Sequence, residues 1–136
     1  MFDAGYGMNG PRRESTGCAE QPAVLDAAVL AGQTLGDEAL ARSVLAMFLD
    51  QSADVLRVVR DTQDPQARAD AAHLLKGSSR AIGAARVSAA AQQVEDLPAD
   101  APQSHVLSAV AALHASVAEA RAAIAARIDG NASHGL

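Results

Sequence analysis

The sequence predicts an all-α fold, an antiparallel up-down-up-down four-helix bundle with a short extra helix at its N-terminal end. Three observations support this prediction. Only 2% of the 136 residues are aromatic, whereas β-sandwiches and barrels draw on aromatic and β-branched residues. Alanine is the most frequent residue, and leucine and valine recur at spacings of three and four, as on amphipathic helices. The connections between the periodic segments are short, which favours antiparallel neighbours.

The first predicted helix covers about residues 22–32, with Pro22 at a first-turn position. The second covers about residues 37–60 and carries two neighbouring apolar stripes. One stripe consists of Leu40, Val44, Met47, Gln51, Val55 and Val58, and the other of Leu45, Leu49 and Leu56. An apolar arc this wide needs two neighbours, so we expect either the first helix or a partner protein to cover part of it.

The third predicted helix begins at Asp64-Pro65, an N-cap residue followed by a proline at the first helical position. It should end near Ile82, because Gly83 can adopt the left-handed conformation that closes a helix. The fourth covers about residues 84–97 and stops before Pro98, and the fifth runs from about 100–102 to Ile128. The expected core stripe of the fifth helix is Val106, Val110, Leu113, Val117, Ala120, Ile124 and Ile128.

These helices form one expected domain over residues 21–130, between a flexible N-terminal tail (1–20) and a frayed C-terminal tail (131–136). The chain is too short for a catalytic ATPase together with a regulatory domain. Its net charge of −5 argues against nucleic-acid binding, which requires a basic stripe. We see no run of 18 apolar residues and no secretory signal, and therefore expect neither membrane insertion nor export.

The histidines and the single cysteine, Cys18, lack the spacing of a metal site, and the chain has no glycine-rich phosphate-binding loop. We therefore expect no bound metal, no cofactor of its own and no ATP-binding site. A single cysteine fits a reducing cytoplasm.

The third predicted helix carries the candidate functional residues. At ~100° per residue its side chains divide between two faces. The face expected to point at the core carries Ala71, Leu75, Ser78 and Ile82. The opposite, solvent face carries His73, Lys76, Gly77 and Arg80.

His73 on this solvent face is a candidate nucleophile. The cations Lys76 and Arg80 favour a neutral imidazole, whose free ring nitrogen can attack an electrophile. They would also favour an anionic group attached to that nitrogen. Gly77 costs about 1 kcal/mol relative to alanine in mid-helix, and it removes bulk where another surface could approach. The pattern is typical of a site for a transferred phosphoryl group; the alternative is a surface histidine without a chemical role.

The segment His73-Leu74-Leu75-Lys76-Gly77-Ser78-Ser79, followed by Ile82-Gly83-Ala84, resembles the signature of histidine-containing phosphotransfer (HPt) domains of multistep phosphorelays. The helix pattern over about residues 22–130 is similar to that family as well. The resemblance implies that His73 accepts the phosphoryl group through Nε2 and that Lys76 helps to neutralise its oxygens. It also implies that Gly77 leaves room for the partner and that Ser78 permits close helix packing.

In this family a residue of the following helix commonly bonds the other ring nitrogen, and the matching position is Glu95. A carboxylate bonded to Nδ1–H would fix the tautomer and leave Nε2 unprotonated. The alternative is that Glu95 is an ordinary surface acid paired with an arginine. A role for Arg80 depends on the helical geometry alone.

The resemblance implies a cytoplasmic, bacterial phosphotransfer protein that shuttles a phosphoryl group between receiver-domain aspartates. Its partners would be response-regulator receiver domains and a hybrid or histidine kinase, with Mg²⁺ supplied by the receiver. We expect a monomer whose docking surface includes Gly77, Arg80 and apolar residues of the second helix such as Leu45 and Leu49.

Three alternatives remain open. The chain could be a helical adaptor that binds a signalling partner without chemistry. It could resemble the phosphoacceptor domain of a chemotaxis histidine kinase, which an ATP-binding kinase domain labels directly. It could also be a dimerising histidine phosphotransfer bundle, which we expect less because one chain already contains four core helices.

Overall fold

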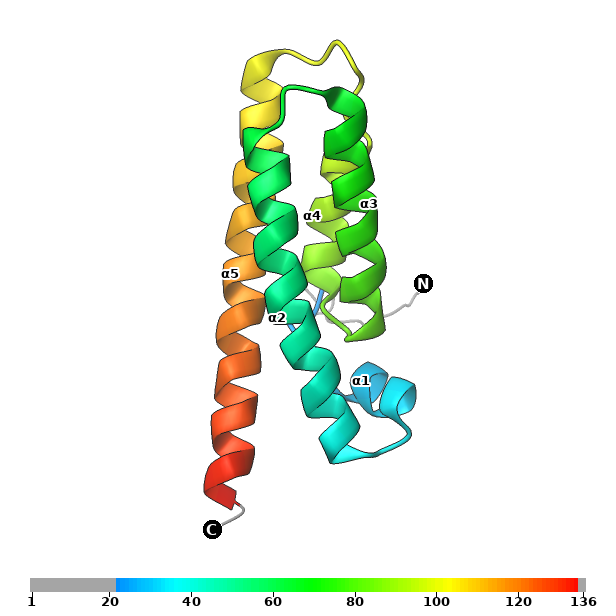
Figure 1. The fold of residues 1–136 in the computed structure, drawn as a ribbon, viewed down its shortest axis with the longest axis vertical. Helices are drawn as coiled ribbons and strands as arrows, with labels where there is room; N and C mark the ends of the chain where they lie inside the picture. Colours follow the sequence, from blue (N-terminus) through cyan, green and yellow to red (C-terminus); the bar gives the residue numbers. More distant parts are fainter. Residues whose placement is uncertain (1–21, 135–136) are drawn as a thin grey trace, which may run out of the picture.

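The computed structural model describes residues 22–134, and within this range the chain forms α-helices and no strand (Figure 1). The helices are α1 (Ala27–Thr34), α2 (Glu38–Asp61), α3 (Pro65–Ala81), α4 (Ala85–Glu95) and α5 (Gln103–His134). Helices α2 to α5 alternate in direction, and α1 lies at the lower end of the bundle beside α2 (Figure 1). This arrangement confirms the predicted up-down-up-down bundle with an extra N-terminal helix. The expected tail over 1–20 lies outside the described residues.

Aspartates cap the N-termini of the first three helices. The Oδ1 atoms of Asp26, Asp37 and Asp64 accept backbone N–H groups of α1, α2 and α3, respectively, at 3.0 to 3.3 Å. These bonds satisfy amides that have no partner within the helix. Because the caps are local in sequence, the starts of α2 and α3 were predictable.

The predicted start of the first helix is wrong, because α1 begins at Ala27 and not near Pro22. The preceding segment is instead bonded to the start of α4. Arg86 donates from Nε to the Pro22 carbonyl at 2.8 Å and from its backbone N to the Ala23 carbonyl at 3.1 Å. These contacts are distant in sequence, and the helix therefore starts only at the Asp26 cap.

The buried core follows the predicted helices, although two of them are rotated relative to the expected faces. Helix α2 buries Ala41, Leu45, Phe48, Ser52, Val55 and Val59, whereas Leu40, Met47 and Val58 of the predicted stripe are exposed. Leu75 and Ile82 are buried as predicted. Ala72 and Ser79 of α3 are buried in place of Ala71 and Ser78, which are half-buried. The apolar arcs were wide enough to permit either rotation, and packing against neighbouring helices selects one.

Helix α5 matches its predicted stripe and extends further than expected. Val106, Leu113, Val117, Ala120 and Ile124 are buried. The helix continues through Gly130 to His134, beyond the expected end at Ile128, because Gly130 does not adopt the left-handed conformation that would end it. By length and composition alone, residues 103–130 could cross a membrane, but a core helix meets the same criterion.

The α3–α4 turn is fixed by a close backbone contact. Gly83 has φ +78°, and a Cβ atom there would lie 2.6 Å from the Asp26 carbonyl oxygen. The Asp26 backbone N–H donates to the Gly83 carbonyl at 2.9 Å. Glycine tolerates both the left-handed backbone and the close approach. This turn aligns α3 antiparallel to α4 and thereby brings their side chains together.

Candidate functional site

His73 projects from the middle of α3 into solvent. Its side chain is 67% exposed, as expected for the solvent face of the helix. Ala72, the residue before it, and Leu75, two positions after it, are buried in the core. The helix backbone therefore holds the imidazole in a fixed place on the surface while the ring stays accessible to another molecule.

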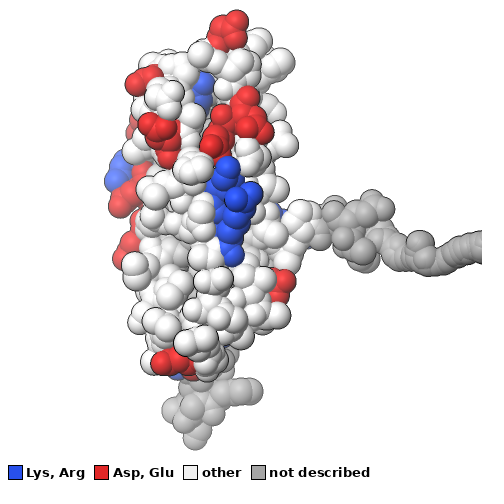
Figure 2. Space-filling view, turned by 90° about the vertical axis from the view of Figure 1, so that its right-hand side faces the viewer, with Lys and Arg blue, Asp and Glu red and all other residues white. Residues whose placement is uncertain are grey.

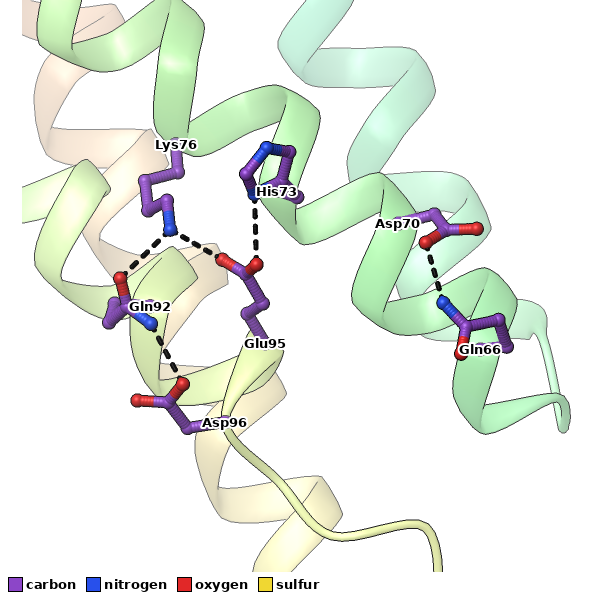
Figure 3. A network of polar contacts seen from close by, with 7 residues as sticks. All are labelled: Gln66, Asp70, His73, Lys76, Gln92, Glu95 and Asp96. Atoms are coloured by element: carbon purple, nitrogen blue, oxygen red, sulfur yellow. Dashed lines mark hydrogen bonds and ion pairs between the residues drawn. The ribbon is translucent and has the colours of Figure 1, made fainter.

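Glu95 of α4 holds one nitrogen of this ring. Its Oε2 lies 2.8 Å from His73 Nδ1, across a sequence separation of 22 residues. A carboxylate can only accept hydrogen bonds, so Nδ1 carries the proton that it donates to Glu95. In the neutral ring Nε2 then has a free lone pair, and Figure 3 shows this second nitrogen directed away from the carboxylate. The expectation that Glu95 is the histidine's partner agrees with this geometry.

Lys76 is placed differently from the prediction. Its side chain is only 11% exposed and lies between α3 and α4 rather than on the solvent face. The ammonium group lies 2.7 Å from Glu95 Oε1 and donates to Gln92 Oε1 at 2.9 Å. The rotation of α3 toward α4 explains the difference, because the long alkyl stem packs between the helices while the ammonium reaches polar partners. Lys76 therefore acts on Glu95, which in turn contacts the histidine (Figure 3).

Glu95 remains a carboxylate in this environment. The hydrogen bond from Lys76, chiefly, and that from His73 lower the pKa of Glu95, while its partial burial opposes them. The group is thus ionised at neutral pH. It can accept the hydrogen bond from Nδ1–H and offset positive charge that develops on the ring.

Gln92 was not anticipated from the sequence. It accepts from Lys76 and donates from Nε2 to Asp96 Oδ1 at 2.8 Å. The signal that could have identified it is spacing, because Gln92 precedes Glu95 by three residues and so shares its helix face. Gln92 extends the network along α4 and gives Lys76 a second acceptor.

Gly77 lies exposed one turn beyond His73. A Cβ atom there would meet nothing within 4 Å, so no packing among the described side chains (residues 22–130) requires a glycine. The prediction that Ser78 faces inward is wrong. Of these two adjacent serines, Ser79 is fully buried, whereas Ser78 is half-buried and donates to Gln51 of α2. The rotation of α3 by about one residue explains the difference. Arg80 is exposed and stands apart from the His73 network.

The expected docking residues on α2 require correction. Leu45 is completely buried, and the prediction that it contacts a partner is wrong. Leu49 is half-buried against the core, and its carbonyl accepts from Arg121 of α5 at 2.6 Å. Met47, in contrast, is 69% exposed. It borders a groove of about 240 Å³ between α2 and α3 that Ser78 also lines.

The surface on the α3 side of the bundle is divided by charge. In Figure 2 the face on the α3 side shows a cationic patch near its middle, acidic side chains above and a largely uncharged area below. Exposed apolar side chains of α2 and α3 include Met47 and Leu74. Among the side chains of residues 22–130, no three His, Cys, Asp or Glu residues group as metal ligands. The arrangement supports nucleophilic attack by Nε2 on an electrophile that another molecule presents.

Comparisons with known proteins agree with this geometry. The family model of the Hpt domain matches residues 43–123, a range that contains α3, α4 and the whole His73 network. The fold is similar to the crystal structure of the histidine phosphotransferase ShpA from Caulobacter crescentus, with a TM-score of 0.67 and 25% sequence identity. That match covers 83% of this chain and 98% of the other. No curated protein sequence matches the chain.

Proposed function

The chain belongs to the Hpt domain family, and we propose that it shuttles a phosphoryl group between receiver-domain aspartates through Nε2 of His73. The observation that carries this proposal is the pairing of an exposed imidazole with a carboxylate on its other nitrogen, at 2.8 Å. That pairing leaves one nucleophilic nitrogen pointing to solvent, where a partner can reach it.

The proposed step is a reversible in-line displacement. The Nε2 lone pair forms a bond to phosphorus while the bond from phosphorus to the receiver's aspartate oxygen breaks, and the electron pair leaves with that carboxylate. The ring becomes a phosphoimidazolium, whose positive charge lies beside Glu95. Mg²⁺ would arrive with the receiver and neutralise phosphoryl charge. Lys76 serves mainly to hold Glu95, since its ammonium contacts that carboxylate and Gln92.

The proposed docking surface lies around Gly77. Because glycine has no side chain, a partner has room beside His73. Arg80 provides a positive charge two turns beyond His73 on α3. Met47 and Leu74 offer exposed apolar contacts in place of Leu45. A surface of this kind suits a small, transient interface, which a shuttle needs in order to release each partner.

We further propose that the protein acts as a monomer in the bacterial cytoplasm and has no ATP-binding site of its own. On this view a hybrid or histidine kinase begins the relay, and receiver domains exchange the phosphoryl group with His73. The adaptor without chemistry and the domain labelled directly by a kinase are the competing functions that the following experiment separates.

The test is a transfer assay against a panel of phosphorylated receiver domains and, separately, an ATP-supplied histidine kinase. We expect the receivers to give acid-labile label on the wild type, no label on His73→Gln, and unchanged labelling of His114→Gln, which alters another exposed histidine. Equal labelling of His73→Gln would refute the mechanism. Label from the kinase alone would favour the directly phosphorylated domain. Partner binding without any label would favour the adaptor.

A further inference from the structure

Arg68 is a largely buried arginine whose cation has no protein partner. It lies in the first turn of α3 and is only 6% exposed. Within residues 22–130 its side chain makes no hydrogen bond or ion pair; its backbone N–H alone is bonded, to the Asp64 carbonyl. A guanidinium carries five N–H donors, and none of the Arg68 nitrogens is sealed from solvent. These donors are therefore open to a ligand that enters from water.

Arg68 is one of the residues that line a small cavity. It has a volume of about 70 Å³ and lies between the α2–α3 connection and the beginning of α5. Its polar lining consists of Arg60, Thr62, Gln63, Arg68 and Gln103. The opposite wall is made by valines and a leucine of α2 and α5. The cavity therefore combines two guanidinium groups with two amides in an otherwise apolar setting.

The carboxylates closest in sequence to the cavity are already engaged. Asp61 accepts from Nε of Arg60 at 3.0 Å, and Asp64 caps α3 through Gln66. Arg60 thus uses only one of its donor groups on Asp61. Gln103 is the first residue of α5, and a helix N-terminus adds partial positive charge. The field in the cavity is therefore suited to an anion.

We propose that this cavity binds a small oxyanion of the phosphate class, held chiefly by Arg68. A water molecule occupies roughly 10–15 Å³ on a comparable measure, so the cavity holds one tetrahedral oxyanion and excludes a nucleotide. Guanidinium groups recognise such oxygens with paired donors. Arg68 and His73 are five residues apart, which separates them by about 140° around the helix. The site is thus distinct from the phosphotransfer site and does not depend on it.

The test is a titration of the full chain with inorganic phosphate at constant pH and ionic strength, followed by calorimetry and by backbone amide NMR. We expect saturable binding that shifts the amides of Thr62 and Gln103. Arg68→Met, which keeps an unbranched apolar side chain but removes the charge and the donors, should weaken binding at least tenfold. Arg57→Met, an exposed arginine outside the cavity, should bind as the wild type does.

Several outcomes would overturn the proposal: no saturable binding to the wild type, unchanged binding to Arg68→Met, or shifts confined to another surface. Tighter binding of acetate than of phosphate would overturn the assignment to the phosphate class. If Arg68→Met does not fold, the wild-type shift map decides alone. His73→Gln should bind phosphate normally, so failure of the phosphorelay function and failure of this site can be told apart.

Discussion

Replacing Gly77 by alanine should make the protein more stable and a poorer phosphotransfer partner. The two effects have different origins. Gly77 lies inside α3, where glycine is less favourable than alanine because its backbone loses more conformational freedom on folding. The added methyl group would meet nothing within 4 Å, so packing within the described chain does not oppose the substitution.

The expected size of the two effects follows from this geometry. The free energy of unfolding should rise by about 1 kcal/mol, the difference in helix propensity between alanine and glycine. The methyl group would stand on the surface one turn from His73, where we propose that the receiver approaches. A misplacement of about 1 Å between reacting groups can slow a reaction about a hundredfold, so we expect transfer to fall by one to two orders of magnitude.

The measurement combines urea unfolding with the rate of label transfer from a phosphorylated receiver. Gly32→Ala is the matched control. Gly32 is also a helical glycine with open space around its Cβ position, but it lies in α1. We expect Gly32→Ala to gain similar stability and to transfer at the wild-type rate.

Three results would refute this reasoning. A Gly77→Ala protein that transfers as fast as the wild type would show that partners do not approach this part of α3. A Gly77→Ala protein that is less stable than the wild type would show that the fold itself requires the glycine. Equal slowing by Gly32→Ala would remove the link to the His73 surface.

Two further predictions concern the turn and the carboxylate. Gly83→Ala should lower the free energy of unfolding by at least about 2 kcal/mol, because the added Cβ would lie 2.6 Å from the Asp26 carbonyl oxygen at a φ of +78°. A urea titration that gives the variant the wild-type free energy of unfolding would contradict this. Since the pKa of Glu95 lies below its ordinary 4.5, its contribution to stability is present above that pH and lost as the pH falls through the lowered value. The stability difference between wild type and Glu95→Gln should therefore shrink below pH 4.5, and a difference constant from pH 7 to 3 would refute the assignment.

The local sequence was sufficient to predict the helices and the candidate nucleophile. Asp64 followed by Pro65 predicted where α3 begins, and the observed helix begins at Pro65. The position of His73 on the solvent side required only the helical period and the apolar residues around it. Such features depend on residues within one or two turns of one another, and a linear pattern records them directly.

Which residues of a wide apolar arc face the core could not be predicted in the same way. Leu45 and Met47 both appeared on apolar stripes of one helix, yet Leu45 is buried and Met47 is exposed. The choice depends on how α2 rotates against its neighbours, and several rotations bury a similar amount of apolar surface. A rotation of α3 by about one residue likewise places Lys76 in the α3–α4 interface and not on the expected solvent face.

By itself, the sequence determined that this is a helical bundle with an accessible histidine beside a helix glycine, because helix periodicity, caps and glycine effects act over a few residues. Only the tertiary structure decided that Lys76 reaches Glu95 and that Arg68 lines a cavity between helices. These contacts join separate helices, and their formation depends on the rotation and spacing at which whole helices pack, which no single stretch of sequence specifies.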